Sequence, residues 1–103
     1  MLAGCATPAS ETDREPLVVV TSNILGDVTS QIVGSEAEIV TLMPPGADPH
    51  EYQPSTQDIA ALHEADLVIS VGLGFEEALE AQLVAAESSG VTVVDIAEDI
   101  SPL

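Results

Sequence analysis

The sequence has 103 residues, with 18 acidic side chains against a single lysine or arginine, and a formal net charge of −17. One cation cannot neutralise the phosphates of a nucleic acid or of an anionic lipid surface, so nucleic-acid binding and attachment by a basic patch are excluded. Hydrophobic residues make up 46% of the chain, which argues against a disordered acidic tail. The length allows one domain at most, and with 2% aromatic residues its core must consist of Val, Ile, Leu and Ala.

The acidity has three interpretations: a cationic partner, a surrounding medium of high salt, or ordinary solubility. Self-repulsion at this net charge destabilises a compact state, and salt relieves it by screening. Because the chain contains no lysine at all, we include adaptation to salt as a hypothesis.

Residues 1–16 are predicted to lie outside the folded domain, with a flexible tether from Ala6 to Pro16. The segment from Ala6 to Pro16 is polar, contains two prolines and has no apolar periodicity. The sequence has no run of 18 apolar residues, so no membrane-spanning helix is predicted.

The folded part is predicted to begin at Leu17. Residues Leu17–Val20 form a β-branched run typical of a strand that is buried on both faces. Asn23 is expected to cap a helix that ends at Gly34. The apolar residues of this helix recur at the spacing of one helix face: Ile24, Val28 and Ile32.

Three further strands alternate with two helices. Ile39–Leu42 is the second predicted strand, and the three prolines of residues 43–50 forbid a helix directly after it. Ser55 and Asp58 form a capping box that opens the second helix. The third and fourth strands are predicted at Leu67–Val71 and Val91–Val94. The third helix between them is marked by apolar residues and closed by a glycine: Phe75, Leu79, Leu83, Ala86 and Gly90.

This alternation predicts an α/β fold, a parallel sheet with helices on both faces. Ligands of such sheets bind beyond the carboxyl ends of the strands. The proline-rich loop with His50 follows the carboxyl end of the second strand, where a site is expected.

His50 is the candidate metal ligand of this loop. Neutral imidazole is a common ligand of zinc and similar metals, and nearby acids could orient its second nitrogen. Pro49 and Pro54 would hold the ring in place. From the residues alone, a loop histidine without a ligand is the favoured interpretation, because a tight zinc site needs three or four protein ligands. His63, on the second helix, is expected to be exposed and receives no role.

Other motifs do not indicate an enzyme. The turn Gly72-Leu73-Gly74 lacks the third glycine of a dinucleotide-binding loop, and the acids that follow it would repel a phosphate. We therefore expect a tight strand-to-helix turn, no organic cofactor, and a surface location for the pair Glu76 and Glu77. Cys5 is the only cysteine, so it forms no internal disulfide, and no nucleophilic grouping is present.

The loop over residues 42–54 closely resembles a known family through its pattern Pro-Pro-Gly-x-Asp-Pro-His-x-Tyr-x-Pro. It is similar to the first metal-ligand loop of the zinc/manganese-binding solute-binding proteins of ABC transporters (cluster A-I, lipoprotein-receptor-antigen family). Residues 21–27, 55–58, 65–68 and 72–76 also follow this family in order and spacing. The resemblance covers Leu17 to Leu103 and favours the ligand interpretation of His50.

The resemblance implies two α/β lobes joined by a long helix, with the metal between them. The family's ligands are a His of this loop, a second His, a Glu or His, and an Asp, and only His50 matches a position here. The second His of the family falls just beyond Leu103. The resemblance therefore implies an incomplete amino-terminal lobe over residues 17–103 that binds metal weakly by itself.

The implied function is extracytoplasmic capture of zinc or manganese for the permease of an ABC transporter, without enzymatic activity. Leu2-Ala3-Gly4-Cys5 is similar to a bacterial lipobox, which makes Cys5 the expected lipid anchor on the outer face of the cell membrane, with a periplasmic location as the alternative. Only four residues precede Cys5, so a signal sequence would be present as a remnant. The alternatives are a surface adhesion lipoprotein of the same fold, a non-functional fragment, or a domain of an unrelated enzyme.

Overall fold

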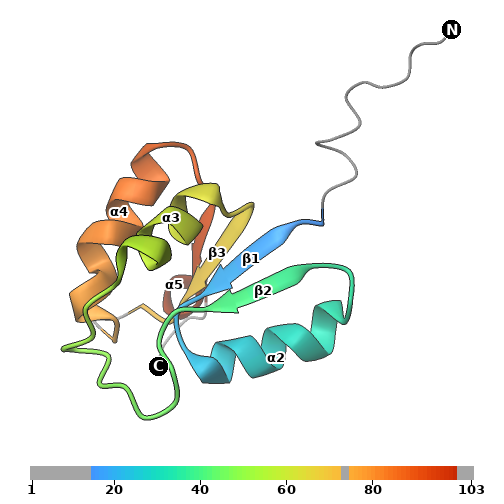
Figure 1. The fold of residues 1–103 in the computed structure, drawn as a ribbon, viewed down its shortest axis with the longest axis horizontal. Coiled ribbons are helices and arrows are strands. Elements are labelled where there is room, and N and C mark those ends of the chain that lie inside the picture. Colours follow the sequence, from blue (N-terminus) through green and yellow to red (C-terminus); the bar gives the residue numbers. More distant parts are fainter. Residues whose placement is uncertain (1–14, 73–74, 100–103) are drawn as a thin grey trace, which may run out of the picture.

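A computed structural model of the chain describes residues 15–72 and 75–99, and they form a four-stranded parallel sheet (Figure 1). The strand order is β2-β1-β3-β4, and all three pairings are parallel. The predicted α/β fold is confirmed: β1 has the predicted ends, and the ends of the other strands differ from the predicted ones by at most two residues. The strands are β1 (Leu17–Val20), β2 (Glu38–Thr41), β3 (Leu67–Ser70) and β4 (Val93–Asp95).

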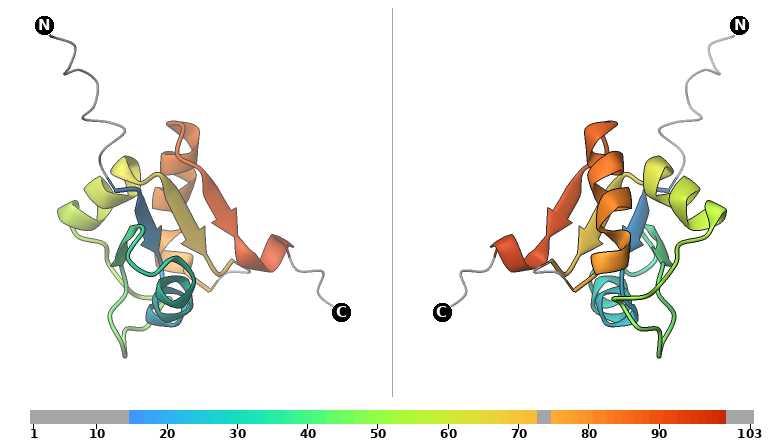
Figure 2. Two further views of the ribbon diagram at one scale, coloured as in Figure 1. Left: turned by 90° about the vertical axis from the view of Figure 1, so that its right-hand side faces the viewer. Right: turned by 90° about the vertical axis from the view of Figure 1, so that its left-hand side faces the viewer.

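Helices cover both faces of this sheet (Figure 2). The helical elements are α2 (Asn23–Val33), α3 (Thr56–Glu64), the 3₁₀ turn η2 (Glu77–Leu79), α4 (Glu80–Ser88) and α5 (Ile96–Asp99). Helix α2 packs over β1 and β2, whereas α3 and α4 pack together on the opposite face. The chain passes from β1 to β2 and then returns across β1 to β3. The strand order therefore reverses between β1 and β3. None of the helices in the described segments is long and apolar enough to cross a membrane.

The main core lies between the sheet and the pair α3 and α4. Its buried members are aliphatic or methionine side chains, as the low aromatic content requires: Val19, Leu42, Met43, Leu62, Val68, Leu79 and Ala86. On the other face, Val18 and Val20 are 7% and 0% exposed. The prediction that Leu17–Val20 is buried on both faces is therefore confirmed for its last three residues.

Helix α2 differs from its prediction in its cap and in the face it turns to the sheet. Ser22 is the N-cap, with Oγ accepting from the N–H of Leu25 at 3.3 Å, and Asn23 is the first helical residue. The predicted apolar face is exposed: the exposed fractions are 70%, 52% and 78% for Ile24, Val28 and Ile32.

Small residues face the sheet instead, and they let the helix approach it closely. A Cβ atom added to Gly26 would lie 3.4 Å from Val20 Cγ2 and 2.5 Å from Thr41 Oγ1. Gly26 and Thr29 are the buried residues of α2. The spacing i, i+4, i+8 thus predicted a helix correctly. The face of α2 that packs closest to the sheet is the one with small residues, because the β-branched side chains of the strands leave little room above them.

The third predicted helix begins later than its apolar pattern indicates. Phe75 precedes η2 and α4 and is 37% exposed. Glu76 has φ −101° and ψ 53°, so the backbone there is not helical. Its side chain turns back to the N–H groups of Val71 and Gly72. Gly90, with φ +109°, follows the end of α4 as predicted.

Candidate functional site

The loop between β2 and α3 is held at both of its ends. At its start, the N–H groups of Leu42 and Met43 donate to the carbonyl oxygens of Val20 at 3.0 Å and Thr21 at 3.1 Å. Leu42 and Met43 are each only 3% exposed. At its end, Ser55 caps α3, which leaves the intervening residues as a braced loop above the sheet.

The predicted capping box of α3 also fastens Tyr52 to the helix. Ser55 Oγ accepts from the N–H of Asp58 at 3.1 Å, and Asp58 Oδ2 accepts from the N–H of Ser55 at 2.9 Å. The same Oδ2 accepts from the hydroxyl of Tyr52 at 2.5 Å. This hydrogen bond, with burial and the Asp58 charge as smaller causes, raises the pKa of Tyr52 to about 12. Tyr52 packs against the hydrophobic core and so ties the loop to it.

Asp48 fixes the backbone on which His50 stands. Its Oδ1 accepts from the N–H of His50 at 2.9 Å, and its carbonyl oxygen accepts from the N–H of Glu51 at 3.1 Å. Pro49 lies inside this turn and restricts φ further. The main chain of His50 is therefore fixed from within its own loop.

The imidazole of His50 contacts an acid from a different element. Its Nδ1 lies 3.2 Å from Oε1 of Glu77, the first residue of η2, and the side chains are 58% and 69% exposed. The sequence indicated an acid near His50 in the chain, but the acid that contacts the ring stands 27 residues away. Both residues follow carboxyl ends of parallel strands, and that shared edge is the signal that could have indicated the contact.

Glu76 was predicted to lie on the surface, and this prediction is wrong. The residue is 4% exposed. Its Oε2 accepts from the hydroxyl of Thr21 and from the N–H of Val71, both at 2.5 Å, and its Oε1 accepts from the N–H of Gly72 at 3.0 Å. Donor groups from the ends of β1 and β3 compensate the buried charge. The carboxylate therefore fills the position between β1 and β3 where the strand order reverses, which is the usual ligand position of an open α/β sheet.

Gly72 makes the turn that brings Glu76 to this position. It has φ +90°, and an added Cβ atom would lie 1.8 Å from Asp95 Oδ1. Both the backbone conformation and the close approach of Asp95 require glycine. The predicted tight turn is confirmed at Gly72, whereas residues 73 and 74 lie outside the described part of the chain.

The described residues contain no group of three or more His, Cys, Asp or Glu side chains that could hold a metal ion. The site therefore offers one imidazole, with Glu77 beside it. One imidazole does not complete the tetrahedral coordination of zinc. The described residues thus place one imidazole beside Glu77 at an exposed edge of the sheet.

The other candidates lie elsewhere. His63 is exposed in the last turn of α3, and its Nδ1 lies 3.3 Å from Ser89 Oγ. Because α3 runs antiparallel to the strands, His63 lies at the edge of the sheet opposite to His50. Cys5 lies outside the described residues, as does most of the predicted tether.

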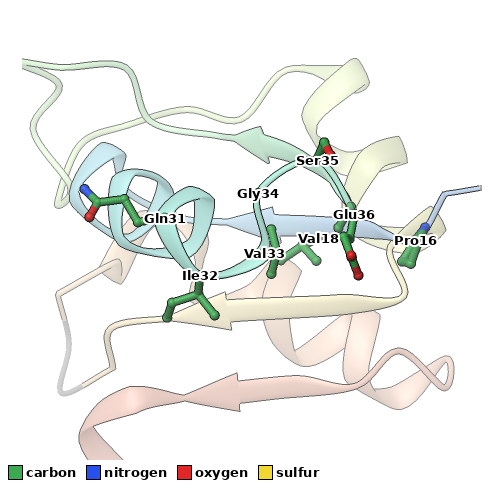
Figure 3. Close-up of a pocket in the computed structure, with 9 residues that line it drawn as sticks. Pro16, Val18, Gln31, Ile32, Val33, Gly34, Ser35 and Glu36 are labelled. Carbon is green, nitrogen blue, oxygen red and sulfur yellow. The ribbon is translucent and has the colours of Figure 1, made fainter.

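A hollow of about 690 Å³ lies where α2 ends and β1 begins (Figure 3). Nine residues line this hollow, and Glu36 is the one ionisable residue among them. The hollow lies at the edge of the sheet away from His50.

Known proteins match nearly the whole chain. A family model described as zinc-uptake complex component A, periplasmic (ZnuA), matches residues 18–103. The manganese-binding lipoprotein MntA of Halalkalibacterium halodurans is 39% identical over an alignment of 104 residues. The alignment covers 98% of this chain and 34% of that protein. The manganese ABC transporter substrate-binding lipoprotein PsaA of Streptococcus pneumoniae is 38% identical over 77 residues, which cover 74% of this chain and 25% of that protein.

Solved structures agree with these matches. The periplasmic zinc binding protein TroA from Treponema pallidum superposes with a TM-score of 0.78 and 31% identity, covering 85% of this chain and 31% of that one. The chain thus spans about a third of the length of the relatives it matches. Because the family model covers most of the sequence, the chain belongs to the ZnuA family of periplasmic zinc-uptake components.

Proposed function

We propose that this chain is the metal-binding amino-terminal lobe of an extracytoplasmic solute-binding protein that captures zinc or manganese for an ABC permease. The observation that carries the proposal is the braced loop of residues 42–55, which presents His50 at the carboxyl edge of the sheet in a chain of this family. The relatives whose names specify a metal include both manganese-binding and zinc-binding proteins, so either cation is a candidate cargo.

The proposed mechanism is shared ligation. His50 donates one nitrogen to the ion, and further ligands come from outside the described residues, because these contain no group of three or more His, Cys, Asp or Glu side chains that could hold the ion. The relatives are about three times as long as this chain, which leaves room for a second lobe that closes on the ion. Closure removes water from the ion and strengthens each bond to it.

Metal titration by calorimetry of the intact protein tests this role of His50. We expect His50→Ala to weaken binding of zinc or manganese by at least 100-fold, because one of about four ligands is lost. His63→Ala is the matched control: it removes the other imidazole of the lobe at the opposite edge, and we expect a change below about threefold. Equal losses from the two substitutions would refute the assignment of the loop.

A second titration addresses how complete the site is. The 103-residue chain alone should bind zinc only weakly, because it provides one imidazole in the described region. Nanomolar binding at one ion per chain would contradict shared ligation.

We further propose that Cys5 carries a lipid anchor, and that the protein is held on the outer face of the membrane. The support is the sequence Leu2-Ala3-Gly4-Cys5 together with the lipoproteins among the relatives. Mass spectrometry of the native protein should show an acylated Cys5 at its amino terminus, and Cys5→Ser should release the protein from the membrane fraction. An unmodified Cys5 in membrane-bound protein would contradict the anchor.

A further inference from the structure

The contact between His50 and Glu77 determines which imidazole nitrogen carries the proton. A carboxylate only accepts hydrogen bonds, so a neutral ring that contacts it through Nδ1 must hold its proton on Nδ1. Nδ1 lies 3.2 Å from Glu77 Oε1. Nε2 of His50 then retains its lone pair, which is the form of the ring that binds a metal.

Glu77 is held in place by its neighbour. The backbone of Glu76 enters η2 immediately before Glu77, and its carboxylate is clamped by Thr21, Val71 and Gly72. On the other side, Leu79 is fully buried in the core and donates its N–H to the carbonyl oxygen of Glu76 at 2.8 Å. The exposed Glu77 side chain therefore extends from a backbone that is fixed at both sides.

No basic side chain in the described region competes for Glu77. The single lysine or arginine of the sequence is Arg14, which precedes the described residues. Among 18 acids, Glu77 is the one whose carboxylate has a described contact with the His50 ring. The neighbouring Asp48 instead uses its carboxylate on the backbone of His50.

We propose that Glu77 is a positioning residue for His50: it fixes the imidazole as the Nδ1–H tautomer and so presents Nε2 to the metal. This role rests on the proposed function of His50 and adds to it a residue from η2. Both side chains are more than half exposed, so the contact is expected to tune metal affinity and not to create it. Partners of this kind typically change metal affinity by roughly 10- to 100-fold, and exposure favours the lower limit here.

The test begins with the metal-free intact protein, in which nitrogen NMR reports the ring tautomer at a pH where the imidazole is neutral. We expect the Nδ1–H form of His50 in the unmodified protein and a shift toward Nε2–H in Glu77→Ala. Glu77→Gln should preserve the Nδ1–H form, because the amide oxygen still accepts. Glu80→Ala, which removes an exposed acid three residues further on, should also leave the tautomer unchanged.

Zinc titration of the same variants completes the test. Glu77→Ala should weaken zinc binding about 10-fold. Glu77→Gln should retain most of the affinity of the unmodified protein, and Glu80→Ala should change that affinity less than twofold. An unchanged tautomer in Glu77→Ala, or an equal loss in Glu80→Ala, would overturn the positioning role while leaving the ligand role of His50 intact. Zinc binding that survives His50→Ala would instead overturn the proposed function itself, whatever the tautomer.

Discussion

Replacing Glu76 by glutamine should destabilise the lobe, although the change alters only one atom of the side chain. The carboxylate accepts three hydrogen bonds from two strand ends and is 4% exposed. A glutamine has one acceptor oxygen, so its NH₂ group must face at least one backbone N–H, whichever way the amide is turned. The N–H of Val71 or of Gly72 is then left without an acceptor.

The magnitude follows from these bonds. An unsatisfied buried donor costs about 1–3 kcal/mol, and the bonds that survive lose their charge assistance. Against this loss, the neutral amide avoids the desolvation of a buried charge. We expect the hydrogen bonds to prevail and Glu76→Gln to lower the free energy of unfolding by about 2 kcal/mol, with about 4 kcal/mol for Glu76→Ala, which removes all three bonds.

Urea unfolding of the chain, monitored by far-UV circular dichroism, measures the difference in unfolding free energy. The difference is read from the shift of the urea midpoint, provided that the dependence of the free energy on urea concentration is the same in both proteins. Glu77→Gln is the matched control, because it makes the same atomic change at the exposed neighbour, and its stability should stay within about 0.5 kcal/mol. If Glu76→Gln proves as stable as the unmodified chain, desolvation of the buried carboxylate offsets its hydrogen bonds. The three hydrogen bonds of Glu76 would then not be a net source of stability.

Other changes test the core, the turn, the loop and the charge. Leu62→Ala, at a fully buried site, should cost about 3 kcal/mol of unfolding free energy in urea. Gly72→Ala should lower the melting temperature by more than 5 °C, because φ is +90° and the new methyl group overlaps Asp95. Tyr52, the only tyrosine, should form phenolate by ultraviolet absorbance near pH 12, and at lower pH in Asp58→Asn. Since its pKa is raised by folding, stability should fall between about pH 10 and pH 12. The melting temperature should rise from low to molar salt because the net charge is −17, and equal values would exclude salt adaptation.

The strands and the position of the loop that carries His50 were predictable because their signals are local. The run Leu17–Val20 and the capping box at Ser55 are each contained within a few residues, and the parallel order follows from the alternation of strands and helices. The burial of Glu76 was not predictable in this way. Glu76 and Glu77 are chemically identical neighbours, and only the donors gathered by β1 and β3 distinguish the buried one from the exposed one.

The orientation of α2 escaped prediction for a related reason. Its apolar pattern indicates which residues share a face, but not which face lies nearest to a sheet of β-branched side chains. Gly26 and Thr29 allow the closer approach, so Ile24 and Val28 point away from the sheet. In both places the local sequence is compatible with two arrangements, and the tertiary neighbours select one.

The acidity of the chain acquires a structural role from these contacts. With no lysine and one arginine in the sequence, carboxylates in the described region are compensated by main-chain N–H groups in place of basic side chains. Five of them accept such a bond: Asp48, Asp58, Asp66, Glu76 and Asp95. A carboxylate that accepts from the backbone is fixed by short-range geometry, so added salt, which screens the long-range repulsion, should leave these bonds in place. The acids thus organise the turns at the strand ends.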